Sequence, residues 1–200
     1  MKINIFQGND LVDFWVWVDP DNWLVKDQIT EVGGFTSGGL VNKKSNLMFI
    51  PNPDFEFDIT PYQFGIMREY IVEYNLELAR IKKFSNYPSR LNSIYLFKSE
   101  LEASKYKRIH PEHVRNRILK KAHSVIPCLY SVHDSSWVDF LRLLYSVDLK
   151  SLDRICDAYW SGALVEDVKL TSREEPWTQE PILEVLFIGR IEFYDRSLDR

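Results

Sequence analysis

Cysteine is scarce in this chain of 200 residues, which contains only Cys128 and Cys156. Both lie inside apolar stretches, and two isolated cysteines fit neither a disulfide framework nor a cysteine-based zinc site. No apolar run approaches the length that spans a membrane, and the first residues become polar too early for a signal peptide. These absences predict a soluble protein in a reducing, cytoplasmic setting with no membrane partner.

A large excess of one charge is also missing, because the net charge is −4 and both signs are mixed along the sequence. Broad attraction to nucleic acid is therefore not expected. The one basic stretch, from Lys105 to Lys121, is typical of a solvated helix face, and a nucleic-acid groove is the less favoured interpretation. An apolar fraction of 45% is ample for one continuous core. The prediction is a single domain over residues 1–200.

Several sequence motifs that carry well-known chemistry are absent. The pairs Gly33-Gly34 and Gly38-Gly39 lack the Lys-Ser/Thr that follows in a nucleotide-binding loop, so they are predicted to lie in a long loop. No hydrolase, zincin or dinucleotide-binding signature is present. His110 and His113 lie close together, but no carboxylate or thiolate companions are recognised at a metal-binding spacing, so no metal is expected.

Local patterns predict an α+β protein, because strands come early and late with helices between them. Strands are expected over 2–7, 13–18, 93–97, 126–133, 182–187 and 190–194, with an irregular segment over 31–60. Helices are expected over 62–84, from Ser99 through Ala103, and over 111–124, 135–147 and 151–160. Ile188-Gly189, between the last two strands, fits either a hairpin turn or a bulge.

Three local details sharpen these expectations. In the strand over 13–18, alternation places Phe14, Val16 and Val18 on one face and two tryptophans on the other. Ser99 is expected to cap its helix, with Glu102 closing a capping box. The helix over 62–84 carries an apolar stripe that is expected to enter the core, formed by Met67, Tyr70, Ile71, Tyr74, Leu78 and Ile81.

Glu184 is unusual because it lies in the most hydrophobic strand-like run of the chain, Ile182–Ile188. Ionised carboxylates are rarely buried without a partner. One interpretation places Glu184 on a solvent face. The other places it on the floor of a cleft, because its same-face neighbours Leu186 and Ile188 are also apolar.

Several segments, in order, resemble the ADP-ribosyltransferase-like fold, in particular its small bacterial and phage members. They are the strand, turn and helix start at Val16–Asn22, the helix end at Glu77–Arg80, Pro88–Phe97 with the helix through Ala103, Tyr159–Gly162, and Glu184–Gly189. The resemblance implies two small, mostly antiparallel sheets that form a cleft with several flanking helices. It also implies NAD as substrate and a macromolecular acceptor, protein or nucleic acid.

Carried over by position, the resemblance makes Glu184 the catalytic carboxylate and Tyr95 the aromatic residue that stacks on nicotinamide. Arg90 and Ser93 would support the dinucleotide. Trp17 occupies the first-strand position where the family carries His or Arg, and it can stack or donate only one hydrogen bond. The expected activity is transfer of ADP-ribose from NAD.

A different class of function stays open beside this one. The chain could be a non-catalytic interaction module, such as a degenerate member of the same fold, that binds a protein partner through exposed aromatic residues. Trp15, Trp17 and Trp23 cluster near the N-terminus, and exposed tryptophan is a common interface anchor.

Overall fold

The structure is a computed structural model that describes residues 5–8, 10–37, 61–143, 149–172 and 175–198. Its strands are β1 (Ile5–Gly8), β2 (Asp13–Val18), β3 (Gly34–Thr36), β4 (Ile94–Phe97), β5 (Ile118–Asp134), β6 (Leu170–Ser172), β7 (Glu175–Trp177) and β8 (Leu183–Phe193). Its α-helices are α1 (Trp23–Asp27), α3 (Pro61–Lys83), α4 (Glu100–Ile109), α5 (Ser136–Leu143) and α6 (Leu149–Trp160). Short turns of other helix types are η1 (Gln28–Val32), η2 (Arg90–Asn92), η3 (Pro111–His113) and η4 (Val165–Asp167). The mixture confirms the α+β class.

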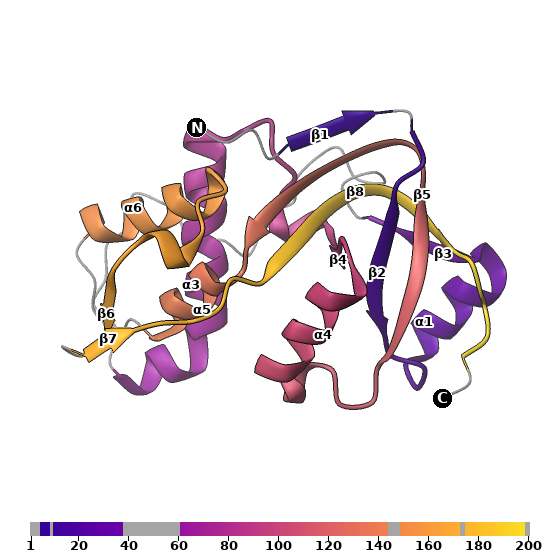
Figure 1. Cartoon of the computed structure of the whole chain (residues 1–200), viewed down its shortest axis with the longest axis horizontal. Coiled ribbons are helices and arrows are strands. Elements are labelled where there is room, and N and C mark those ends of the chain that lie inside the picture. Colours follow the sequence, from indigo (N-terminus) through magenta and orange to yellow (C-terminus); the bar gives the residue numbers. More distant parts are fainter. Residues whose placement is uncertain (1–4, 9, 38–60, 144–148, 173–174, 199–200) are drawn as a thin grey trace.

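The long strands β5 and β8 form the centre of an antiparallel sheet, and both curve strongly (Figure 1). A register shift between Val125 and Leu129 divides their pairing into two parts. In one part the strand order is β1-β5-β8-β4, and in the other it is β2-β5-β8-β3. A pair between Trp15 and Phe97 joins β2 to β4 across the two parts. The small β6–β7 ribbon is separate from this sheet.

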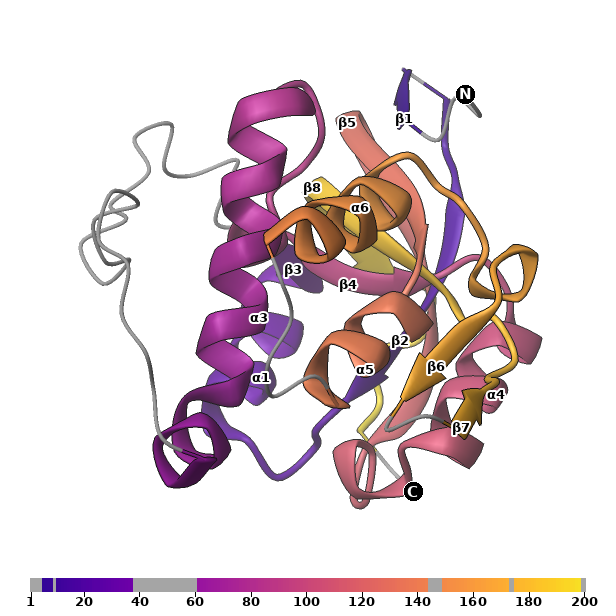
Figure 2. The ribbon, with the colours of Figure 1, turned by 90° about the vertical axis from the view of Figure 1, so that its left-hand side faces the viewer.

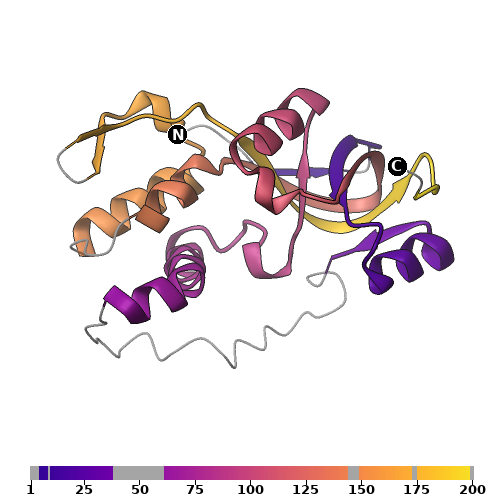
Figure 3. The ribbon, with the colours of Figure 1, turned by 90° about the horizontal axis from the view of Figure 1, so that it is seen from below.

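Helices α3, α5 and α6 gather at one end of the sheet, which faces the viewer in Figure 2, whereas α1 and β3 lie at the other end (Figures 1 and 3). Two large hydrophobic clusters follow this division. Leu186 of β8 packs in the cluster formed mainly by residues of α3, α5 and α6. Its neighbours Val185 and Phe187 pack in the second cluster, which is formed mainly by strand residues. The continuous apolar run of β8 is explained by this position, because both faces of the strand are covered.

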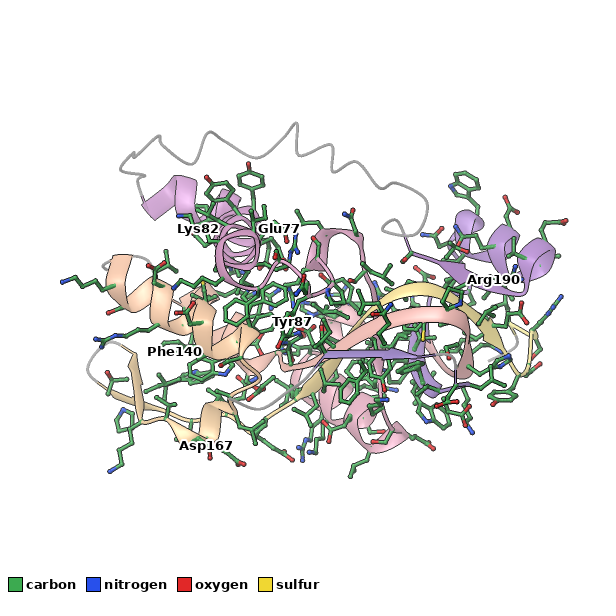
Figure 4. All side chains as sticks on the ribbon, turned by 90° about the horizontal axis from the view of Figure 1, so that it is seen from above. Glu77, Lys82, Tyr87, Phe140, Asp167 and Arg190 are labelled. Atoms are coloured by element: carbon green, nitrogen blue, oxygen red, sulfur yellow. The ribbon has the colours of Figure 1, made fainter. Side chains whose placement is uncertain are left out.

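Side-chain packing is dense where the helices meet the sheet. Tyr87 lies in the middle of this packing (Figure 4), with its ring centroid 5.8 Å from that of His133 and 6.2 Å from that of Trp160. The indole N–H of Trp160 donates to the backbone oxygen of Leu76 over 2.8 Å, so α6 is tied to α3. Through His133 these contacts pack the helical end of the molecule against the end of β5, which pairs with the start of β8.

The strand expected over 13–18 is confirmed, with Phe14, Val16 and Val18 buried and the tryptophans on the other face. Ser99 caps α4 as expected, since its hydroxyl oxygen accepts from the backbone N–H of Glu102 over 3.2 Å. The Glu102 carboxylate instead accepts from Leu183 N–H over 3.1 Å, so it holds the start of β8.

The helix expected over 111–124 is wrong. After the single turn η3, residues from Ile118 onward form the first half of β5, between β2 and β8. The alternation there is hidden because the buried positions carry Lys120, Ala122 and Ser124 rather than large apolar residues. The buried Lys120 amino group reaches Asp195 O over 3.0 Å. The basic stretch therefore divides between α4 and β5 and is not one helix face.

The segment expected to be irregular over 31–60 contains a strand where it is described. β3 pairs with β8, and a side chain at Gly34 would place its Cβ 1.7 Å from the carbonyl oxygen of Ile191. Only glycine allows this close approach. Gly38-Gly39 and residues through 60 lie outside the described residues.

Of the two alternatives for Ile188-Gly189, the hairpin turn is wrong, because β8 runs through these residues without interruption. The irregularity lies opposite, on β5, at the register shift. The buried face of α3 also differs from the apolar stripe predicted for this helix. Val72, Leu76 and Ala79 are the buried apolar residues among the described side chains of α3, whereas Ile81 is exposed.

The remaining helices agree with expectation where they are described. α6 ends at Trp160, and Gly162 follows with a φ of 72°, a left-handed conformation that suits a helix stop. α5 begins at Ser136, next to the Asp134 carboxylate that accepts from Ser136 N–H over 3.0 Å. The expected end of this helix near 147 lies outside the described residues.

Candidate functional site

A cavity of about 290 Å³ lies among β2, β4, α4, η3, α5 and the start of β8. Its lining combines aromatic, acidic and basic side chains. The aromatic residues are Trp17, Tyr95, Phe97 and Tyr106, the carboxylates are Glu73, Asp139 and Glu184, the arginines are Arg90, Arg117 and Arg142, and the histidines are His110 and His113. Such a mixture suits a ligand that has both flat rings and charged groups.

Glu184 is 6% exposed and lines this cavity, so the interpretation that placed it on a solvent face is wrong. The Arg90 guanidinium and the Tyr159 hydroxyl both donate to its Oε1 atom, the latter over 2.7 Å. None of the hydrogen bonds among the described residues ends on Oε2. The carboxylate is therefore held through one of its two oxygens, at the wall of the cavity.

Arg90 is as buried as Glu184, at 6% exposed, and it has a full set of partners. Besides Glu184, its guanidinium makes two hydrogen bonds to the Glu73 carboxylate, of 2.8 and 3.0 Å, and one of 2.7 Å to Tyr159 Oη. The rings of Tyr95 and Tyr159 lie 5.1 and 5.3 Å from its central carbon. Arg90 therefore positions Glu184, and the dinucleotide-binding role that the resemblance implied for it stays a prediction.

The backbone that carries Arg90 is anchored to α3 by Ser89. The Ser89 hydroxyl donates to Glu77 Oε2 over 2.9 Å and accepts from Leu91 N–H over 3.2 Å. Glu77 is itself buried and paired with Arg80. Ser89 and Arg90 can therefore be buried, because their polar and charged groups have hydrogen-bond partners there.

Burial sets the protonation behaviour of these groups. It raises the pKa of the Glu184 carboxyl above its usual value, although Arg90 and Tyr159 act in the opposite direction. Burial also raises the pKa of Tyr159 well above the usual value for tyrosine, so its hydroxyl stays a donor. A carboxylate with a raised pKa is suited to accept a proton or to stabilise a positive charge that develops beside it.

Tyr95 faces the cavity and is 40% exposed, so its ring is accessible to a ligand. Its hydroxyl donates to Arg90 O over 2.9 Å, which fixes the ring relative to the Glu184 network. Ser93 is not in the cavity lining, and its hydroxyl donates to Ser89 O over 2.7 Å. Of these two sequence candidates, the structure brings Tyr95 into the site and leaves Ser93 outside it.

Trp17 lines the cavity, but its indole N–H donates to Ala103 O over 3.2 Å. Its one donor is thus in use, and the Lys107 amino group lies over its ring, 5.2 Å from the centroid. Trp15 and Trp17 are half-buried against the cluster that contains Phe97 and Ala103, whereas Trp23 is 72% exposed. The expectation of three exposed tryptophans is wrong for Trp15 and Trp17.

Two arginines that sequence reasoning did not select bring positive charge to the cavity. Arg142 pairs with Asp139 over 2.9 Å and with Glu69 over 2.7 Å. Arg117 is exposed in the cavity lining, and it takes part in none of the ion pairs within the described part of the chain. Only their place in the folded chain identifies them, because in the sequence they lie 25 positions apart among other charged residues.

The histidines of the cavity form a cluster that the sequence analysis did not recognise. Ligand-type atoms of His110, Glu112 and His113 all lie within 4.8 Å of one another. Burial and the neighbouring His110 lower the pKa of His113. The expectation that no carboxylate accompanies these histidines was wrong, because the spacing His-Pro-Glu-His places Glu112 between them.

His133, next to the site, gives a prediction for the dependence of stability on pH. Burial lowers its pKa to about 3, and its ring is 3.0 Å from Tyr159 O and 2.7 Å from Ser131 Oγ. Below about pH 6.5 the His133 imidazole binds a proton in the unfolded chain but stays neutral in the folded chain. The free energy of unfolding therefore falls as the pH drops. Because of this residue, the free energy of unfolding measured in urea should be about 2 kcal/mol lower at pH 5 than at pH 7.

His133→Gln should remove that part of the pH dependence. If the variant and the original protein lose the same free energy between pH 7 and pH 5, His133 does not stay neutral in the folded state.

The sequence predictions covered Glu184, Arg90, Tyr95 and Trp17 but missed Tyr159, Glu73 and the groups on α5. Tyr159 lies within Tyr159–Gly162, one of the segments that carry the family resemblance, so that segment could have pointed to it. Comparison of the sequence with models of known protein families and with curated proteins gives no match. No helix in the described residues has the length and apolar character to cross a membrane.

Proposed function

We propose that this chain is a single-domain mono-ADP-ribosyltransferase of the ADP-ribosyltransferase-like fold, acting on NAD in the cytoplasm. The observation that carries the proposal is the Glu184 carboxylate, which Arg90 and Tyr159 fix through Oε1 in the lining of a mixed aromatic and basic cavity. Two parts of the sheet that share β5 and β8 are compatible with the expected pair of small sheets. The acceptor is a macromolecule, protein or nucleic acid.

The chemistry explains the residue types. Breaking the bond between nicotinamide and ribose develops an oxocarbenium-like positive charge, which a fixed carboxylate stabilises. Glu184 Oε2 would hydrogen-bond the ribose hydroxyl or accept the proton of the incoming nucleophile. Arg90 and Tyr159 keep the carboxylate oriented, so little reorganisation is needed when the charge develops.

The rest of the cavity supplies the binding contacts in this proposal. The accessible face of Tyr95 would stack on the flat, cationic nicotinamide ring. Arg117 would contact the diphosphate, since it has no described ion-pair partner. Trp17 would offer its ring face, because its N–H is already bound to Ala103.

Thermal unfolding with and without NAD tests the binding step. A ligand present at 100 times its Kd stabilises the folded state by about 2.7 kcal/mol. For a chain of this size that raises Tm by roughly 5 to 10 °C. Tyr95→Ala should reduce the shift at a fixed NAD concentration, because the stacking contact is lost.

Tyr194→Ala is the matched control, since Tyr194 is exposed and lies outside the cavity lining. An equal NAD-induced shift of Tm in the original protein and in both variants would show that Tyr95 does not contact NAD. No shift in the original protein would favour the alternative of an interaction module. Trp23 would then be its exposed tryptophan, because Trp15 and Trp17 are half-buried.

A further inference from the structure

The turn that follows α4 brings two imidazoles into register. Pro111 begins the 3₁₀ turn η3, whose preceding residue is His110 and whose last residue is His113. A 3₁₀ turn has three residues per turn, so side chains at i and i+3 lie one above the other. The rings of His110 and His113 are accordingly almost parallel, at 7°, with centroids 5.0 Å apart.

Glu112 places a carboxylate beside both rings. Its Oε1 atom is 3.8 Å from His110 Nδ1 and 3.6 Å from His113 Nε2. Two ligands bound to one ion at 2.0–2.1 Å with tetrahedral angles lie roughly 3.3 Å apart. The two separations from Glu112 exceed this value by a few tenths of an ångström, and all three ligand atoms lie within 4.8 Å of one another. Rotation of the side chains would bring them to the binding distance.

The other nitrogen of each ring is already held. His110 Nε2 is 3.0 Å from Asp139 Oδ2, and His113 Nδ1 is 2.9 Å from the hydroxyl oxygen of Tyr106. Histidines that bind metals commonly donate their second N–H to a carboxylate or another oxygen, which fixes the tautomer and the ring orientation. Asp139 is in turn held by Arg142 and Gln179. These contacts direct the remaining nitrogens of both rings toward Glu112.

We propose that His110, Glu112 and His113 bind one divalent transition-metal ion, of which Zn²⁺ is the representative. Two imidazole nitrogens and one carboxylate oxygen suit this class of ion, whereas Mg²⁺ and Ca²⁺ prefer sites made of oxygen. Three protein ligands leave at least one coordination position for water or a ligand. His110 and His113 line the cavity that contains Glu184, so the ion would add positive charge beside Arg117 and Arg142.

Direct titration with Zn²⁺ tests this site without NAD, so failure of the proposed transferase activity does not affect the result. The full chain, free of any polyhistidine tag, is titrated in competition with a chromogenic chelator. One Zn²⁺ per chain is expected. Glu112→Gln and His113→Ala should each weaken binding by at least about tenfold, and Asp139→Asn by about 10- to 100-fold through loss of ligand orientation.

His123→Ala is the control, because His123 lies on β5 outside the cluster. It should leave both stoichiometry and affinity unchanged. Glu112 and His113 are exposed, so their substitution should preserve the fold, and circular dichroism of each variant checks this. Absence of stoichiometric binding, or equal affinity in the original protein and His113→Ala, would overturn the proposal.

Discussion

Glu184→Gln is expected to lower the rate of nicotinamide release from NAD by roughly 10²- to 10⁴-fold. The amide keeps the size of the side chain and an oxygen that can accept from Tyr159, but it loses the negative charge that, in the proposed reaction, would stabilise the cationic transition state. Arg90 retains its two hydrogen bonds to Glu73, so the network around the substitution is not dismantled. The rate is measured by chromatography of nicotinamide, with NAD at a saturating concentration.

Glu180→Gln provides the matched control for this experiment. Glu180 lies shortly before β8 and undergoes the same chemical change, but it is exposed and pairs with Arg108 and Lys105 away from the cavity lining. Its activity should equal that of the original protein. Equal activity of Glu184→Gln and Glu180→Gln would show that Glu184 has no catalytic role.

Arg90→Met is expected to lower the free energy of unfolding by about 3–5 kcal/mol. Breaking a buried ion pair by removing one partner leaves an uncompensated charge in the interior. In this chain two carboxylates would lose their partner at once, Glu184 and Glu73. Urea unfolding monitored by tryptophan fluorescence gives the value, because six tryptophans are present.

A second substitution separates lost charge balance from lost packing. Arg90→Met combined with Glu184→Gln should be more stable than Arg90→Met alone, because the buried charge is removed. Arg108→Met removes an exposed partner of Glu180 and should change stability little, since solvent screens such pairs. If Arg90→Met lowers the free energy of unfolding no more than Arg108→Met does, the buried ion pairs of Arg90 do not stabilise the fold.

The parts of the fold that the sequence predicted are those with a clear local period. β2 is the best example, because Phe14, Val16 and Val18 alternate with residues of the opposite face and nothing competes with that pattern. The caps at Ser99 and Gly162 were equally local, since a hydroxyl or a left-handed glycine acts within a few residues.

The first half of β5 could not be recognised locally. Lys120, Ala122 and Ser124 occupy its buried positions, and none of these residue types signals a buried strand. Pairing with β2 and β8 decides the conformation, and those partners are distant in the sequence. The same reason explains the error at Gly189, where the irregularity belongs to the opposite strand.

The sequence predicted some residues of the site, but not the hydrogen bonds that join them. Glu184 was selected because a carboxylate in an apolar run is unusual, and its burial in the cavity lining agrees with that interpretation. Its bonds to Arg90 and Tyr159 join positions 94 and 25 residues apart. Contacts of this kind follow from the folded chain, so the positioning role of Arg90 could not be predicted from spacing.

Incubation of the purified protein with labelled NAD in a cell lysate tests the proposed transferase most directly. Transfer predicts label on a macromolecule with the original protein and none with Glu184→Gln. Susceptibility of the labelled product to protease or nuclease then identifies the class of acceptor. Equal labelling by the two proteins, or neither labelling nor nicotinamide release by the original protein, would contradict the proposal.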